Sequence, residues 1–155
     1  MLFNFFRPIR TPEELVRRKP TYGGLCWWIE CNIWYDKKWW MSWPTSEEVL
    51  KTRKAACKGF AILTYDCLKL LGYDPHIISI TADEKAEGTF DGKYHHAVVF
   101  VEIAGTWYGV SCGILSRHDK QASLLDAVKD FKPDANYIAE HDTKGNHIMT
   151  LMSKI

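Results

Sequence analysis

Residues 53–75 read RKAACKGFAILTYDCLKLLGYDP, and the rest of the chain is interpreted outward from this stretch. From Cys57 onward, apolar residues recur with the spacing of a helix that is buried over a wide stripe. Gly72 then stands where helices commonly end, and Pro75 prevents the helix from continuing. The stretch therefore predicts a buried helix that begins with a cysteine.

A thiol in the first turn of a helix lies near unpaired backbone N–H groups and the positive end of the helix dipole. Both features stabilise a thiolate, which is the nucleophilic form of cysteine. Cys57 is therefore a candidate nucleophile with a lowered pKa. The alternative is that Cys57 is a small buried core residue, as free cysteines often are.

The composition bounds the class of protein. The chain has 155 residues, of which 46% are hydrophobic and 25% charged, so we expect one globular domain over residues 1–155. The net charge of +1 gives no general attraction to nucleic acid or anionic lipid, and no apolar run has membrane-spanning length. The five cysteines are an odd number without a CxxC pair, which argues against a disulfide framework and a zinc site. We therefore expect a cytoplasmic protein without metal, cofactor, nucleic-acid or membrane partner.

The chain before Cys57 predicts short helices and an aromatic-rich stretch. Thr11 with Glu14, and Thr45 with Glu48, match the capping box that begins helices. Residues 21–43 hold six of the seven tryptophans and follow neither a helical nor a strand period throughout. This stretch predicts largely irregular structure with a short helix or strand.

The chain after the Cys57 helix predicts mainly strands. Strands are expected at residues 76–81, 95–103, 106–111, 136–139 and 148–152. Residues 82–94 predict a surface loop, and residues 121–131 predict a helix. Helices followed by mainly antiparallel strands indicate an α+β fold.

The tight turn at residues 104–105 allows the strand register to be counted. A two-residue turn pairs Ile103 with Thr106, and on this register His96 and Ser111 are diagonal neighbours on one face of the sheet. His95 and Cys112 belong to the opposite face. Only one of these faces can pack on the Cys57 helix.

Four segments carry a family resemblance. Residues 57–80, CKGFAILTYDCLKLLGYDPHIISI, resemble the nucleophile helix of the transglutaminase-like superfamily of cysteine peptidases. Residues 96–99 (HAVV) resemble its His-Ala strand, and residues 105–111 (GTWYGVS) resemble its Gly-x-Trp strand. Residues 43–50 (WPTSEEVL) are similar to the segment before the cysteine in bacterial members.

The resemblance implies a papain-like fold in which the nucleophile helix packs on a mainly antiparallel sheet. It implies Cys57 as nucleophile, His96 as base, and a thioester intermediate in reactions on protein or peptide amide bonds. We therefore expect the His96 face to pack on the Cys57 helix, with a ring nitrogen of His96 within about 4 Å of the Cys57 sulfur. The chain departs from the family where Ser111 replaces the usual aspartate and Ala56 replaces a commonly acidic residue. A serine hydroxyl can accept from the imidazole Nδ1–H, but it brings no charge to stabilise an imidazolium.

The tryptophans before Cys57 have two interpretations. Trp39, Trp40 and Trp43 are candidate substrate-binding side chains that form an aromatic wall beside a cleft, and an indole N–H among them could complete an oxyanion hole with the N–H of Cys57. The same rings could instead fill the core under a long loop. Too few basic residues accompany them to favour stacking on nucleic-acid bases.

Two functions from different classes therefore remain open. Cys57 and His96 favour an enzyme, whereas Ser111 and Ala56 favour an inactive module of the same fold that binds a protein or peptide through its tryptophan-rich face. The other cysteines and histidines show no ligand-like spacing and are expected in the core or loops (Cys26, Cys31, Cys67) and at the surface (His118, His141, His147).

Overall fold

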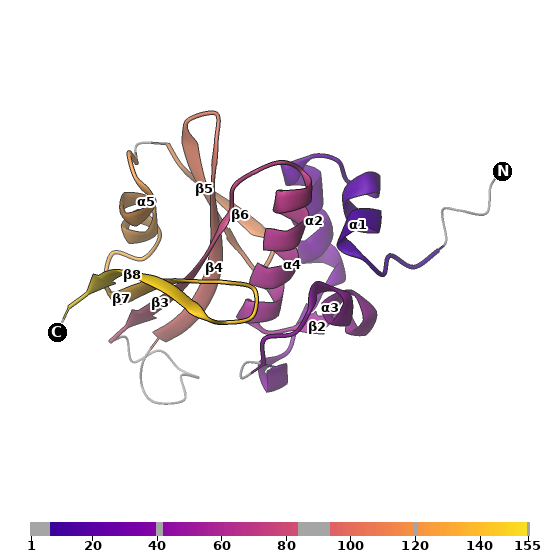
Figure 1. The fold of residues 1–155 in the computed structure, drawn as a ribbon, viewed down its shortest axis with the longest axis horizontal. Helices are drawn as coiled ribbons and strands as arrows, with labels where there is room; N and C mark the ends of the chain where they lie inside the picture. Colours follow the sequence, from indigo (N-terminus) through magenta and orange to yellow (C-terminus); the bar gives the residue numbers. More distant parts are fainter. Residues whose placement is uncertain (1–6, 40–41, 84–93, 120, 155) are drawn as a thin grey trace.

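The computed structural model describes residues 7–39, 42–83, 94–119 and 121–154 (Figure 1). Its helices are α1 (Pro12–Arg18), α2 (Tyr22–Asn32), η1 (Lys37–Trp39, a 3-10 helix), α3 (Ser46–Thr52), α4 (Cys57–Leu70) and α5 (Leu124–Phe131). Its strands are β1 (Trp34–Tyr35), β2 (Lys54–Ala55), β3 (His76–Ala82), β4 (Tyr94–Ile103), β5 (Thr106–Ser111), β6 (Ile114–His118), β7 (Ala135–His141) and β8 (His147–Ser153). Most of the loop expected at residues 82–94 lies outside the described residues.

The fold is α+β, as the order of predicted elements indicated. Six strands form one sheet in the order β6-β5-β4-β3-β7-β8, and all neighbours are antiparallel. The helices α1 to α4 lie on one side of this sheet and α5 lies on the other (Figure 1). The predicted turn is confirmed, because Ala104 and Gly105 have φ angles of 51° and 76° and Ile103 pairs with Thr106.

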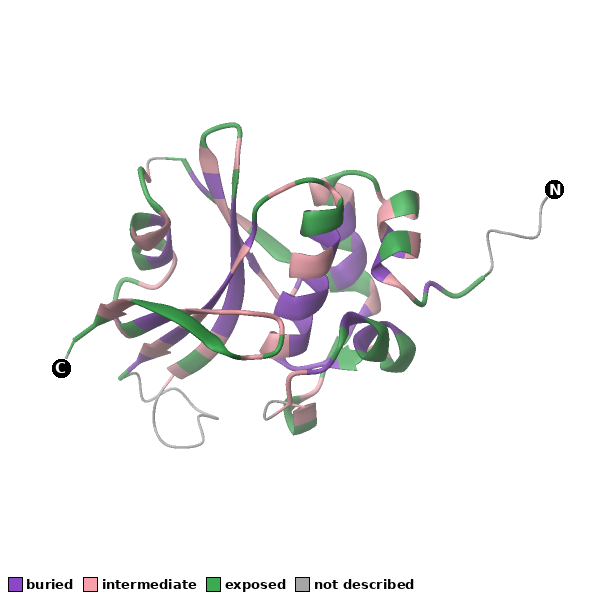
Figure 2. Ribbon diagram, viewed as in Figure 1, coloured by how far each residue is buried: buried purple, intermediate pink, exposed green. Residues whose placement is uncertain are grey.

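The two layers of helices meet the two faces of β4. Ala97, Val99 and Val101 belong to the core beneath α4, whereas Val98 and Phe100 belong to the core beneath α5. A strand that is apolar on both faces is central in its sheet, as the sequence predicted. Figure 2 shows the resulting band of buried residues along the central strands and α4.

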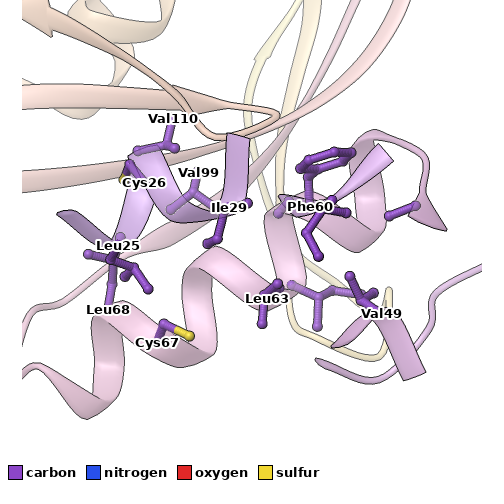
Figure 3. Close-up of a cluster of buried hydrophobic side chains, with 14 of the residues drawn as sticks. Leu25, Cys26, Ile29, Val49, Phe60, Leu63, Cys67, Leu68, Val99 and Val110 are labelled. Atoms are coloured by element: carbon purple, nitrogen blue, oxygen red, sulfur yellow. The ribbon is translucent and has the colours of Figure 1, made fainter. Parts of the chain in front are cut away.

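Helix α4 is the main contact between the helical layer and the sheet. Phe60, Leu63 and Leu68 lie in one cluster with residues of α2, β4 and β5 (Figure 3). Gly59 allows α4 to approach the preceding segment closely, because a Cβ built there would lie 2.8 Å from the Ala55 Cβ. The buried helix predicted after Cys57 is therefore confirmed.

Residues 22–32 form an eleven-residue helix, so the prediction of largely irregular structure is wrong for this part of the tryptophan-rich stretch. Leu25, Trp28 and Ile29 are buried, but the neighbouring Trp27 is 60% exposed. Because apolar residues lie on both the buried and the exposed side of the helix, the sequence shows no clear helical period. The Thr21 side chain accepts a hydrogen bond from Gly24 N and caps the helix. Packing against α4 supplies the stability that the sequence pattern does not reveal.

Two further features were not predicted. Strand β6 follows a turn at Cys112 and Gly113, whose φ angles are 51° and 87°. His118 at its end is buried rather than at the surface, because its Nδ1 lies 2.6 Å from the Asp130 carboxylate of α5 and its Nε2 lies 3.1 Å from the Ser116 hydroxyl. The contact with Asp130 ties α5 to β6, whereas the contact with Ser116 lies within β6.

The two other histidines that were expected at the surface differ in their exposure. His147 is exposed, as expected, whereas His141 is only half-buried and its Nε2 lies 2.8 Å from Ser79 Oγ. Across the described ranges, no helix has both the length and the apolar character needed to cross a bilayer.

Candidate active site

Helix α4 places Cys57 at its first position, as the sequence predicted. The helices α1, α2, α3 and α5 begin with a Thr or Ser side chain that caps them, whereas α4 follows Ala56 and has no side-chain cap. The backbone N–H groups of Cys57 and Lys58 lie in this first turn and act to lower the pKa of the Cys57 thiol. The uncapped first turn is therefore directed at the thiol and at whatever binds beside it.

The Cys57 thiol also contacts the sheet. The backbone N–H of Ala97, the residue after His96, lies near the sulfur and acts to lower the pKa of the thiol. Burial raises the pKa of Cys57, and the surrounding N–H groups oppose this effect without overcoming it. The lowered pKa expected from the helix terminus is therefore wrong for the protein without substrate.

The predicted diagonal contact between His96 and Ser111 is confirmed. The His96 Nε2 lies 2.7 Å from the Ser111 hydroxyl oxygen. The hydroxyl thus contacts Nε2 and not Nδ1, which corrects the expectation from the sequence. Burial lowers the pKa of His96 to about 4, because no opposite charge compensates for the lost solvent. The ring is therefore neutral near pH 7 and supplies no cation that would stabilise a thiolate.

The face of the sheet that packs on α4 is not the one expected. Ala97 and Val110 pack beneath α4, so strand alternation places His96 and Ser111 toward the α5 side. The ring of Tyr94, which packs in the α5 core, lies 5.8 Å from the His96 ring. The expectation that the His96 face covers the nucleophile helix is wrong, because β4 is apolar on both faces and its pattern does not distinguish them.

Cys57 nevertheless reaches β4 where the sheet opens. The β4–β5 ladder ends at the pair Val99–Val110, so Ala97 lies beyond the last pair with β5. The Ala97 N–H lies near the thiol there and acts to lower its pKa. Within the described residues there is no hydrogen bond between the Cys57 thiol and the His96 ring. Because Nε2 contacts Ser111, Nδ1 is the ring nitrogen of His96 that remains to act as a base.

Cys112 lies in the same apolar cluster as Cys57, beneath α4. Burial raises the pKa of Cys112 to about 12, the Cys57 sulfur acts in the same direction, and a hydrogen bond with Ser111 acts against both. The positive φ angle of Cys112 marks the turn that ends β5. All five cysteines, including this pair, are free thiols.

The three candidate substrate-binding tryptophans are placed unequally. Trp40 lies outside the described residues, and Trp39 is half-buried in η1. The Trp43 ring lies 5.2 Å from the Lys58 ammonium and 5.7 Å from the ring of His141. Trp43 thus packs between the start of α4 and the β7–β8 hairpin.

Tyr35 belongs to this site and was missed from the sequence. The parallel pairing of β1 with β2 places Tyr35 opposite Ala55, two residues before Cys57. Its ring stacks on Phe60, with centroids 6.4 Å apart. Burial raises the pKa of Tyr35, and the sulfurs of Cys57 and Cys112 add to the effect. A pairing of two-residue strands leaves no sequence signal that could have found this residue.

Among the described residues, no group of three or more His, Cys, Asp and Glu side chains is arranged to hold a metal ion.

The chain is similar to known proteins in its sequence and in its fold. A family model described as transglutaminase-like domain matches residues 17–111. The fold is similar to that of a candidate cysteine protease from Cytophaga hutchinsonii, with a TM-score of 0.53 and 14% identity over 96% of this chain and 55% of that chain. A structure described as a TGase matches with a TM-score of 0.47 and 16% identity over 70% of this chain and 32% of that chain.

The chain thus spans about half the length of the first structure and about a third of the second. No curated protein matches the chain. At 14% identity the Cytophaga hutchinsonii structure bears on the fold alone.

Proposed function

This chain belongs to the transglutaminase-like domain family, and from that premise we propose that it is a thiol enzyme acting on protein or peptide amide bonds through a thioester at Cys57. The observation that carries the proposal is that Cys57 begins the uncapped helix α4 with its sulfur near the backbone N–H of Ala97, the residue that follows His96 in β4. The reaction is hydrolysis or acyl transfer, according to whether water or an amine attacks the thioester. The proposal includes neither nucleic acid nor a membrane as partner.

The first step begins from a neutral pair. Burial raises the pKa of Cys57 and lowers that of His96 to about 4, so near pH 7 the thiol holds the proton and the imidazole is free to accept it. As the sulfur attacks the substrate carbonyl, His96 takes the thiol proton at Nδ1. The ring must approach the thiol for this transfer, and such contacts commonly tighten only when substrate binds.

The Ser111 contact is compatible with the tautomer that this step needs. When Nε2 donates its hydrogen to the Ser111 hydroxyl oxygen, Nδ1 is left as the acceptor nitrogen. The hydroxyl is neutral, so it orients the ring but adds little stabilisation once the ring becomes an imidazolium. Ser111 is therefore a positioning residue that gives less electrostatic support than a carboxylate.

The rest of the cycle uses the open start of α4. The carbonyl oxygen becomes an oxyanion, which the Cys57 N–H can stabilise because no side chain caps this helix. The carbon–nitrogen bond then breaks, and His96 returns the proton to the leaving amine. Water or a second amine attacks the thioester, its proton passes to His96, and the thiol re-forms. Trp39, Trp40 and Trp43 are proposed to bind the substrate beside this step.

A second function is favoured by a specific observation. Trp27 is 60% exposed, which is unusual for such a large apolar side chain. An inactive module of this fold could use such side chains to bind a protein or peptide. The neutral state of Cys57 and His96 is compatible with this alternative as well.

A cytoplasmic, reducing location is part of the proposal, because a nucleophilic thiol must remain unoxidised. The five free cysteines support it.

The experiment that separates the two functions uses casein as a general protein substrate. Mass spectrometry after incubation, with and without methylamine, reports new chain termini, deamidated glutamine or methylamine adducts. The wild type should give at least one of these products and Cys57→Ala none. A folded wild type that gives none of them, but is retained on a casein column, would support the binding module.

A further inference from the structure

The open side of the Cys57 site carries a tyrosine whose position is fixed by backbone pairing. Strand β1 runs parallel to β2, and Asp36 N donates to Ala55 O at 2.9 Å. Tyr35 lies opposite Ala55, which leads directly into Cys57. Its ring is held against α4 by stacking on Phe60 at an interplanar angle of 22°. The ring therefore has a defined place beside the first turn of the nucleophile helix.

The Tyr35 hydroxyl has the properties of an unused hydrogen-bond donor. Among the described residues it has no hydrogen-bond partner, and the side chain is 52% exposed. Burial and the sulfurs of Cys57 and Cys112 raise the pKa of Tyr35, so the phenol keeps its proton throughout the neutral range. A neutral O–H group beside the nucleophile is suited to bind a negative oxygen.

Acyl transfer creates such an oxygen. The tetrahedral intermediate carries a negative charge on the former carbonyl oxygen, and enzymes commonly stabilise it with two or more donors. The Cys57 N–H at the uncapped start of α4 supplies one donor. The second donor has to come from a group that faces the thiol and is free before substrate binds.

We propose that the Tyr35 hydroxyl is this second donor and stabilises the oxyanion formed on the substrate carbonyl at Cys57. The inference rests on the proposed function, because it assigns a catalytic role within that reaction. Of the indole N–H groups expected from the sequence, that of Trp43 packs against Gly145 of the β7–β8 hairpin, and Tyr35 takes the role in its place.

The neighbouring residue provides a matched control. Trp34 pairs with Lys54, and both are exposed, whereas Tyr35 pairs with the buried Ala55. Side chains alternate along a strand, so Trp34 faces away from α4. Trp34→Phe therefore changes an exposed aromatic ring on the same strand without touching the site.

The test compares two reactions of the same thiol. p-Nitrophenyl acetate acylates Cys57 through a tetrahedral oxyanion and releases p-nitrophenolate, whereas iodoacetamide alkylates the sulfur without forming one. Tyr35→Phe removes only the hydroxyl and keeps the ring. We expect Tyr35→Phe to slow acylation at least about tenfold, toward the 10²–10³-fold loss typical of one oxyanion donor, and to leave alkylation within about twofold. Trp34→Phe should leave both rates within about twofold of the wild type.

Each other outcome has a definite meaning. Acylation of Tyr35→Phe at the wild-type rate would overturn the inference, and so would an equal slowing of both reactions, since the hydroxyl would then act on the thiol itself. Cys57→Ala is measured alongside. A rapid release of p-nitrophenolate that persists in Cys57→Ala would overturn the proposed function together with the inference. So would a wild-type protein in which Cys57 is not acylated.

Discussion

The Nε2 atom of His96 lies 2.7 Å from the hydroxyl oxygen of Ser111. This contact joins β4 to the end of β5 at the place where the two strands separate. It provides the ring with a hydrogen-bond partner that holds no charge. The low pKa of His96 follows, because burial is not offset by a nearby carboxylate.

Replacing Ser111 by aspartate should therefore increase the activity of the site. A carboxylate at this position would raise the pKa of His96 and convert a neutral hydrogen bond to a charge-assisted one when the imidazolium forms. We expect Ser111→Asp to stabilise the transition state by about 1–2 kcal/mol, which is about a tenfold faster acylation of Cys57. Ser111→Asn, of similar shape but neutral, is the control. Equal rates for the two variants would show that charge at this position is irrelevant.

The pH below which the acylation rate falls should be unusually low. His96 can accept the thiol proton only when the ring is neutral, and burial lowers its pKa to about 4. The rate of acylation by p-nitrophenyl acetate should therefore stay constant as pH falls through the ordinary histidine pKa of about 6.5. It should decline only around pH 4. Ser111→Asp should move this decline to higher pH. A decline of the wild-type rate close to the ordinary value would mean that His96 is not the base or is not buried during the reaction.

The same pKa predicts a loss of stability in acid. His96 is protonated near about pH 6.5 in the unfolded chain but only near pH 4 in the fold, so the unfolded state binds more protons between these values. The contribution of His96 is complete above about pH 6.5 and is lost as pH falls toward 4, by up to about 3 kcal/mol. His96→Gln has no ionisable side chain at this position and therefore lacks this pH-dependent contribution to stability. Urea unfolding at pH 7 and pH 4.5 should show a smaller decrease for His96→Gln than for the wild type, and equal decreases would contradict the assignment.

Gly59 should tolerate no side chain, although it lies within a helix. Alanine normally stabilises a helix by up to about 1 kcal/mol relative to glycine, but here its Cβ would lie 2.8 Å from the Ala55 Cβ and 3.1 Å from the Pro44 Cγ. Overpacking of this kind typically costs about 1–3 kcal/mol. We expect Gly59→Ala to lower the free energy of unfolding and to slow acylation, because the start of α4 must shift.

Gly23 in α2 is the matched position, since a Cβ there meets no atom within 4 Å. Gly23→Ala should leave the protein as stable as the wild type or more stable, by up to about 1 kcal/mol. Urea unfolding of both variants decides the point. If Gly59→Ala is as stable as Gly23→Ala, the close approach of α4 to the preceding segment is not a constraint.

Much of the framework could be predicted because it is written in local pattern. The capping box of Thr45 and Glu48 is present with both of its hydrogen bonds, and Ala104–Gly105 makes the expected turn. Once that turn fixed the register, the diagonal contact of His96 with Ser111 followed by counting.

The site depended on features that have no local pattern. Strand β4 is apolar on both faces, so its sequence could not show that α4 covers Ala97 and Val99 and not His96. The pKa of Cys57 depends on how far burial outweighs the N–H groups around the sulfur, and that balance is set by packing. Tyr35 joins the site through a parallel pairing of only two residues on each strand.

The central claim, that Cys57 is a nucleophile activated by His96, is tested most directly by comparing two thiols in the same molecule. The protein is treated with p-nitrophenyl acetate at pH 7, and acetylation of each cysteine is followed by peptide mass mapping. Cys31 is exposed, whereas Cys57 is half-buried with a raised pKa, so Cys57 should react more slowly if it is an ordinary thiol. We predict that Cys57 is acetylated first and that His96→Gln slows this reaction by about 10²–10⁴-fold without affecting Cys31. Acetylation of Cys31 ahead of Cys57, or a rate at Cys57 that does not change in His96→Gln, would contradict the account.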